Sequence, residues 1–250
     1  MSAAGRLCGP KFFPPPRWNQ VPVAAVRDAC LKGFSRWGRP LRIRVDNGSP
    51  WGSTGDWPTA LALWWIGWGI EVIWNPPRQP QKNGVVERAQ GTGKRWAEPH
   101  TCHSAPELQR RIHRLDHLQR DEYPLADGLT RRERFPALHM PHPDAPANWD
   151  FSRVLQHLAG YHIERQVNAC GQVSIYSRNL YVGLKYQKKN VWVLFDPESA
   201  EWIFTDLKGH ELKRHHSRIT SRAVTSFPIT HRPKIPAKSH REQENRRGTT

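Results

Sequence analysis

The stretch LRIRVDNGSPWGS, residues 41–53, decides how the rest of the chain is organised. Its first five residues alternate apolar and basic side chains, which predicts a short strand with one buried face. The strand ends at Asp46, and the Asn-Gly dipeptide behind it predicts a turn. We therefore expect a strand that presents a carboxylate at its C-terminal edge.

Three further elements complete this central stretch. Residues 58–68 (PTALALWWIGW) are apolar and of helix length, and residues 69–77 (GIEVIWNPP) predict a short buried strand that two prolines end. After a polar loop, residues 83–98 (NGVVERAQGTGKRWAE) predict a helix. Four polar side chains share one face of it, namely Asn83, Glu87, Gln90 and Lys94. The packing surface is expected from Val85, Val86, Ala89 and Trp96.

A strand end and a helix thus present two carboxylates, Asp46 and Glu87. Mg²⁺ and Mn²⁺ prefer such oxygen ligands, and a pair of these ions about 4 Å apart clamps both oxygens of a phosphodiester exchange. Lys94 lies two turns beyond Glu87 on the same face, where an ammonium group can meet a DNA phosphate. Taken alone, Asp46 before Asn-Gly is also ordinary turn chemistry.

The combination of VDNGSPW, IEVIWNPPRQPQKNGVVER and GTGKRW, all within residues 45–96, resembles the catalytic core of retroviral-type integrases and bacterial insertion-sequence transposases. These are the DDE recombinases of ribonuclease H-like fold. The resemblance covers about residues 12–135 and is thinner beyond. It implies that Asp46 and Glu87 are the second and third acidic ligands of Mg²⁺ or Mn²⁺. It also implies DNA contacts on the last helix, from Asn83, Arg88, Lys94 and Arg95.

The family pattern has a first Asp at the centre of an opening strand. Here the chain opens at what matches the second strand, around residues 6–13, and no acidic residue precedes Asp28, which lies on a predicted helix. We therefore expect a core that lacks its first strand and first catalytic Asp, and a chain that is inactive alone in DNA transposition. The alternative is a non-catalytic DNA-binding remnant that interferes with a full-length transposase. A third possibility, a ribonuclease H-like nuclease with another role, is less consistent with the C-terminal part of the sequence.

The charge of the chain favours a polyanionic partner. It has 38 basic and 22 acidic residues, a net charge of +16 and a sequence pI of about 10.3. A merely basic protein, or one that reads an anionic membrane surface, is the alternative. The longest apolar run, near residues 61–73, is too short to span a membrane, and no signal peptide opens the chain. Four scattered cysteines without a C-x-x-C pair fit a reducing cytoplasm, and DNA binding implies association with the nucleoid.

Outside the central stretch, residues 7–18 predict a strand and residues 21–38 an amphipathic helix that Gly38 ends. Most of the 12 tryptophans are expected to pack, although Trp51 or Trp57 near the loop is considered for stacking on a base.

Residues 104–121 predict a helix with a capping box at Ser104. That helix turns Leu108, Ile112, Leu115 and Leu118 inward and Arg110, Arg111, Arg114 and Arg120 outward. Zinc is not expected, because no closed finger-like set forms from Cys102, His103, His113 and His117.

The C-terminal part changes character. Residues 140–148 are Pro-rich and predict a linker, and residues 162–215 alternate apolar and polar side chains in short runs. This part resembles the small SH3-like barrel of transposases, with candidate DNA-facing residues Arg165, Arg178, Lys185, Lys188 and Lys189.

The prediction is thus an α/β, ribonuclease H-like core at residues 1–139, a linker, a small all-β barrel at 149–226, and a basic disordered tail at 227–250. The expected partner is double-stranded DNA, both element ends and target, together with a second copy or a full-length transposase. Membrane binding is not expected.

Overall fold

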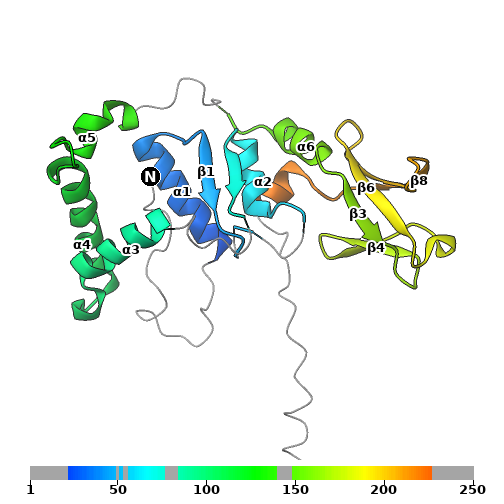
Figure 1. Cartoon of the computed structure of the whole chain (residues 1–250), viewed down its shortest axis with the longest axis horizontal. Coiled ribbons are helices and arrows are strands. Elements are labelled where there is room, and N and C mark those ends of the chain that lie inside the picture. Colours follow the sequence, from blue (N-terminus) through cyan, green and yellow to red (C-terminus); the bar gives the residue numbers. More distant parts are fainter. Residues whose placement is uncertain (1–21, 49–50, 53–55, 77–83, 140–147, 227–250) are drawn as a thin grey trace, which may run out of the picture.

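The computed structural model describes residues 22–48, 51–52, 56–76, 84–139 and 148–226. Figure 1 shows a central α/β core with a helical arm on one side and a β-rich region on the other. The mixed α/β class is therefore confirmed. The predicted opening strand, nearly all of the predicted linker and the predicted tail lie outside the described residues.

The core contains two parallel strands, β1 (Arg42–Val45) and β2 (Glu71–Trp74), paired from Arg42↔Glu71 to Val45↔Trp74. In β1 the arginines are exposed and Val45 is buried, so the alternation in the sequence corresponds to an exposed face and a buried face of the strand. An ion pair of 2.6 Å between Arg42 and Glu71 joins the strands where both begin. Both predicted strands of the central stretch are confirmed, although β2, predicted to be buried, is exposed at Glu71 and half-buried at its other three positions.

Two helices pack with these strands. In α1 (Val23–Trp37) Val26 and Cys30 are buried, and the helix ends at Gly38, whose φ of 74° suits a residue without a Cβ. The second helix, α2 (Ala60–Gly67), is buried at all eight positions, as expected for a helix that is apolar all round. It contacts β2, α6 and α7, so it lies at the centre of the molecule.

A helix that the sequence analysis missed connects the core to the β-rich region. This helix, α6 (Phe151–Ala159), packs on α2, where Val154 and Leu158 are completely buried. Asp150 caps it by accepting a hydrogen bond of 2.8 Å from the Ser152 amide. The prediction of an all-β segment over 149–226 is thus wrong at its start, and a short helix, α7 (Ser221–Ser226), also closes it.

The β-rich region holds a four-stranded antiparallel sheet in the order β3-β6-β7-β8 and a separate hairpin of β4 and β5. The strands are β3 (Ile163–Gln166), β4 (Gln172–Ile175), β5 (Arg178–Tyr181), β6 (Asn190–Asp196), β7 (Glu201–Thr205) and β8 (Glu211–His216).

No closed barrel forms among the described strands, because the β4–β5 hairpin meets β8 through a side chain instead of a backbone ladder. That contact runs from His215 Nε2 to the Tyr181 carbonyl at 2.6 Å. Of the predicted SH3-like barrel, the structure therefore confirms only a small antiparallel β region.

The helical arm contains α3 (Gly84–Ala97), α4 (Ala105–His117) and α5 (Arg131–Arg134), with short turns η3 (Pro99–Thr101), η4 (Leu118–Glu122) and η5 (Pro136–His139) between or after them. It has its own small apolar cluster of Ala97, Cys102 and Leu108, with Ile112 against it.

Two expectations about the arm need correction. In α3, Ala89 and Trp96 are exposed rather than packed, and the side chain of Val85 is not among those described; α3 packs on α4 through Ala97 instead. Ser104 does cap α4 by accepting from the Glu107 amide. The carboxylate of Glu107, however, accepts from the amide of His103 at 2.9 Å, one residue before the position that a capping box requires.

One apolar cluster runs through both the core and the β-rich region. It extends from Val26 in α1 through α2 to Phe204 in β7 and Val224 in α7. Trp57 joins the two parts, since its ring lies 4.7 Å from that of Trp202 and 5.5 Å from that of Tyr161. Trp51 stacks on Trp65 at 5.7 Å, so the packing interpretation of the loop tryptophans is confirmed. Among the described residues, no helix has the length and apolar character needed to cross a membrane.

Candidate nucleic-acid interface

Asp46 lies at the C-terminal end of β1, where the alternating pattern placed it. The residue is half-buried, and its Oδ1 accepts a hydrogen bond of 3.1 Å from the Gly48 amide. Beside it, Asn47 Nδ2 donates to the Asn75 carbonyl at 2.8 Å, which ties the end of β1 to the segment that follows β2. The carboxylate is therefore held at the edge of the sheet by ordinary turn chemistry.

Glu87 lies in the first turn of α3, on the arm rather than on the core strands. Its side chain is exposed and forms no hydrogen bond or ion pair with any residue that the structure describes. Arg88, Lys94 and Arg95 are exposed on the same helix, while Asn83 lies outside the described residues. This stretch of α3 is thus an open, basic surface with one free carboxylate.

Carboxylates such as those of Asp46 and Glu87 suit a hydrated Mg²⁺ or Mn²⁺, since hard cations are bound by one or two carboxylates and water. The structure places the two side chains on different parts of the fold, Asp46 at the end of β1 and Glu87 on α3 of the arm. Over the described ranges, no group of three or more His, Cys, Asp or Glu side chains gathers into a metal site. The side chains considered for zinc are engaged elsewhere: Cys102 Sγ points at backbone carbonyls, and His113 and His117 bond to Gln109 and Asp121.

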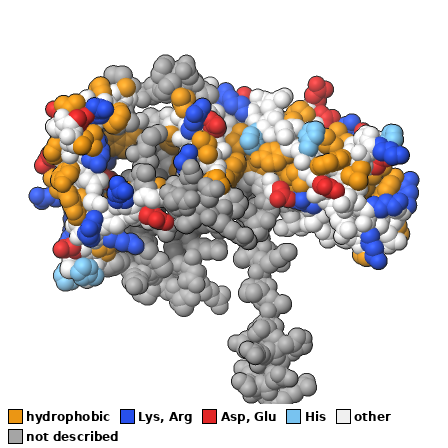
Figure 2. Space-filling model, viewed as in Figure 1, with side chains coloured by type: hydrophobic (Ala, Val, Ile, Leu, Met, Phe, Trp, Pro, Cys, Tyr) orange, Lys and Arg blue, Asp and Glu red, His pale blue; other side chains and the backbone are white. Residues whose placement is uncertain are grey.

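A basic concavity of about 640 Å³ lies at one end of the four-stranded sheet. Here β3 ends, β6 begins, β7 ends and β8 begins, so two turns face each other. We call this concavity the sheet-end groove; its basic lining residues are Lys188, Lys189, Lys208 and His210. Figure 2 shows Lys and Arg side chains gathered at this outer end of the β-rich region.

The first turn of the sheet-end groove holds its lysines in place through the backbone. The Lys188 amide donates to the Val167 carbonyl at 2.8 Å, and the Val167 amide donates to the Lys189 carbonyl at 2.9 Å. Lys188 adopts a φ of 60°, a left-handed conformation that is uncommon for a residue with a side chain. Both lysine side chains remain exposed to solvent.

The second turn contains one carboxylate, Asp206, which is hydrogen-bonded within the turn. It accepts from the amides of Lys208 at 2.8 Å and His210 at 2.9 Å, and it pairs with His210 Nδ1 at 2.9 Å. The side-chain hydrogen bond from His210 is the main reason that the pKa of Asp206 lies below its usual range. Asp206 is bound within its own turn and faces three lysines, so the lining of the groove is positive on balance.

The opposite end of the same sheet is acidic. There Asp196 of β6 lies opposite Glu201 of β7 in the register of the two strands. Arg214 forms ion pairs with both carboxylates, at 2.9 Å to Asp196 and 3.7 Å to Glu201. Hydrogen bonds to Glu211 and Asp196 raise the pKa of Arg214 above its usual range. Of the two ends of the sheet, the groove end therefore carries the exposed positive charge.

The predicted basic residues of the β-rich region divide into two groups. Lys185 is exposed on η6 (Leu184–Tyr186), with its ammonium 5.0 Å from the centre of the Tyr186 ring, and Lys188 and Lys189 line the groove. Arg165 instead pairs with Asp56 near the core, and Arg178 is half-buried, which lowers its pKa. Arg165 is thus bound within the protein, which argues against its assignment to DNA, and Arg178 is only partly accessible.

Sequence reasoning missed Lys208 and His210. The Asp206–Gly209 turn carried the same turn signal as the Lys188–Asn190 turn, but its basic residues gained a role only once the strand order was known.

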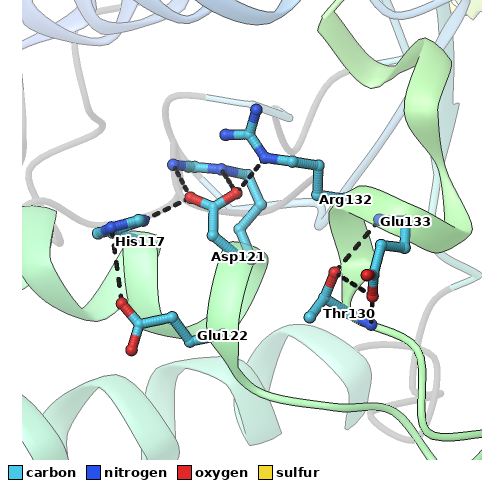
Figure 3. Close-up of polar contacts among 7 residues, drawn as sticks. His117, Asp121, Glu122, Thr130, Arg132 and Glu133 are labelled. Carbon is cyan, nitrogen blue, oxygen red and sulfur yellow. Dashed lines mark hydrogen bonds and ion pairs between the residues drawn. The ribbon is translucent and has the colours of Figure 1, made fainter.

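Several arginines of the arm also serve the fold. Figure 3 shows Asp121 between Arg132 and His117, and Arg120 Nη2 donates to the same carboxylate at 2.7 Å. The pKa of Asp121 falls well below its usual range because Arg132 and then Arg120 and His117 donate to it. Arg120 also lies over the Trp37 ring at 4.4 Å. Arg111 donates to Thr101 Oγ1 at 2.7 Å and pairs with Glu107 at 2.8 Å. Arg111 and Arg120 therefore do not point outward as predicted, whereas Arg110 and Arg114 are exposed.

No protein-family model matches this chain.

Proposed function

We propose that this chain is a DNA-binding protein of the DDE transposase and integrase type. The observation that carries the proposal is the sheet-end groove, where two turns from distant parts of the sequence bring Lys188, Lys189 and Lys208 around one concavity. A net charge of +16 adds a long-range attraction to a polyanion. Spaced ammonium groups match the repeated phosphates of a duplex, whose neutralisation supplies most of the affinity of non-specific DNA binding.

The exposed face of α3 is the second part of the proposed interface. Arg88, Lys94 and Arg95 would contact phosphates of the same double-stranded DNA, and Asn83 completes the set that the resemblance implies. Contacts of this kind fix the position of a protein on DNA but carry no sequence information. Element ends and target DNA would therefore both bind, with a second copy or a full-length transposase as the protein partner.

The resemblance assigns Asp46 and Glu87 to Mg²⁺ or Mn²⁺. When bound, such an ion would make water or a DNA 3′-hydroxyl a better nucleophile for phosphoryl transfer. The chain's own contribution at Asp46 is orientation, because the Gly48 amide holds one oxygen and leaves the carboxylate at the sheet edge. Glu87 is free to turn toward a ligand, since nothing among the described residues binds it.

The second candidate function is a DNA-binding remnant without catalysis, which would occupy DNA and interfere with a full-length transposase. The observation that favours it is that no third acidic, His or Cys side chain joins a metal site among the described residues. A nicking and joining assay with Mg²⁺ or Mn²⁺ separates the two. Metal-dependent activity that disappears in Glu87→Gln supports catalysis, whereas DNA binding without activity supports the remnant.

DNA binding itself is tested with a fluorescent duplex of arbitrary sequence. If about six phosphates are neutralised, the slope of log K against log[salt] should be near −5. Fluorescence anisotropy at several salt concentrations measures this slope. An affinity that does not change with salt, or no binding at low salt, would overturn the proposed function.

A further inference from the structure

A smaller cavity, about 160 Å³, lies where the α/β core meets the β-rich region. Asn47 contributes from the turn after β1, Trp74 from β2, Asp56 and Trp57 from the loop before α2, and Tyr161 from the segment between α6 and β3. The cavity is therefore built by both regions, and Asn47, which lines it, follows Asp46 in the sequence. Neither the proposed phosphate contacts nor the assigned metal ligands use it.

The size of this cavity selects its occupant. A protein cavity of about 150 Å³ holds a single benzene ring. One six-membered ring therefore fits here, whereas a whole nucleotide does not. A pyrimidine base is a planar ring of this size, and its sugar and phosphate would remain outside, near the surface.

The walls suit a flat aromatic ring. Trp57 is only 5% exposed and is fixed by edge contact with Trp202 at 4.7 Å and by Tyr161 at 5.5 Å. Trp74 is oriented by its indole N–H, which donates to the Trp51 carbonyl at 3.5 Å. Preformed aromatic walls favour a stacked base because no side chain has to be ordered when the base enters.

The polar groups of the lining leave acceptors for a base. Asn47 uses its Nδ2 on the Asn75 carbonyl, which leaves Oδ1 without a partner among the described residues. Asp56 pairs with Arg165 through Oδ2, which leaves its other oxygen as an acceptor. The N4 amino group of cytosine is a donor that a carboxylate accepts well, and the N3–H of thymine offers a donor to the same oxygens.

We propose that this cavity holds one unstacked pyrimidine base from a DNA strand whose phosphates lie on the basic surfaces. The inference rests on the proposed function and extends it, because it places a single base at the turn that follows Asp46. A purine has two fused rings and would not be held wholly inside a cavity of about 160 Å³, so we expect it to gain less from this site.

Affinity for a single base tests the proposal. We would compare a short strand of abasic sites that carries one central thymine or cytosine with the same strand lacking any base, and with one that carries adenine. Stacking on aromatic side chains contributes enough for the pyrimidine strand to bind about tenfold more tightly than the abasic strand. Adenine should give no such gain. Equal affinity for all strands, or a gain with adenine as large as with thymine, would overturn the proposal.

Matched variants locate the base. Asp56→Ala removes one acceptor at the cavity and should reduce the tenfold contrast, whereas Asp28→Ala, which removes an exposed carboxylate that also pairs with an arginine, should preserve it. Photo-crosslinking with 5-iodouracil as the single base should label Trp57, Trp74 or Tyr161, identified by peptide mass spectrometry. Labelling confined to other aromatic residues, such as Trp96 or Tyr123, would contradict the assignment.

The same titrations separate the two proposals. If duplex binding depends on salt but the pyrimidine strand binds no more tightly than the abasic strand, only the base-binding inference is wrong. If no DNA binds at low salt, the proposed function falls, and the base-binding inference with it.

Discussion

The helical arm and the β-rich region flank the same α/β core, but different interactions attach them to it. At the junction with the β-rich region, Trp57 and Trp202 are 5% and 2% exposed and belong to one apolar cluster. The arm meets the core where Arg120 lies over the Trp37 ring of α1 and where η5 packs on α1.

The two attachments respond to different changes. Buried aromatic contacts are lost when atoms are removed, because the neighbouring groups cannot fill the resulting cavity. Ion pairs near the surface are weakened by salt and by protonation, and each contributes little. The stability of the junction should therefore change little with salt but fall when a buried aromatic side chain is truncated. The stability of the arm should depend on salt and on protonation and change less when a side chain is truncated.

The largest effect is expected from Trp57→Ala. Removing a buried indole costs about 3–5 kcal/mol of unfolding free energy. Because Trp57 touches Tyr161, Tyr176 and Trp202, core and β-rich region should lose stability together. Urea unfolding followed by circular dichroism and by tryptophan fluorescence measures this. The control is Trp96→Ala on the arm, where the indole is 45% exposed and the loss should be much smaller. Equal losses in the two variants would contradict the comparison.

A smaller effect at the same junction is expected from Tyr176→Phe. The hydroxyl of Tyr176 donates to the Pro58 carbonyl at 2.8 Å, so this variant leaves a buried acceptor without its partner. Such a loss costs about 1–3 kcal/mol. Thermal unfolding compares it with Tyr123→Phe, where the side chain is 54% exposed and little change is expected. A destabilisation no larger than that of the control would show that this hydrogen bond does not hold the hairpin to the core.

The smallest effect is expected in the arm, from Asp121→Asn. Asp121 pairs with Arg120 and Arg132, and its loss should cost about 1 kcal/mol, less in high salt. Since folding lowers the pKa of this carboxyl, its contribution is present above the ordinary Asp pKa of about 3.9 and fades as the pH falls below it. The difference in Tm from wild type should thus persist from pH 7 to pH 5 and shrink in stronger acid. A difference that grows on acidification would contradict this; Asp28→Asn is the exposed control.

Patterns confined to neighbouring residues were readable from the sequence. The amphipathic helix α1, the two faces of β1 and the N-cap at Ser104 all follow from local spacing and are found as predicted, although Glu107 does not complete the capping box. The missed helix α6 also carried a local signal, because Asp150 precedes apolar residues at helical spacing, at Phe151, Val154, Leu155 and Leu158.

Features that depend on strand order or on distant partners could not be read this way. Lys189 and Lys208 are brought to one groove because β6 and β7 are neighbours in the sheet. Arg165 looked like a DNA-facing residue, but its partner Asp56 is 109 positions away in the sequence. Likewise, the carboxylate of Asp46 was placed correctly at a strand end, whereas the sequence alone did not show that Glu87 extends on a separate arm.

The DNA-binding claim is tested most directly by removing two charges from the groove. Lys189→Gln with Lys208→Gln takes one exposed lysine from each turn, and Lys32→Gln with Arg222→Gln removes two exposed charges from α1 and α7. The net charge falls equally in both variants, so only position differs. The account predicts that the slope of log K against log[salt] becomes shallower by about 2 in the groove variant and is nearly unchanged in the control. Equal slopes in the two variants would contradict it.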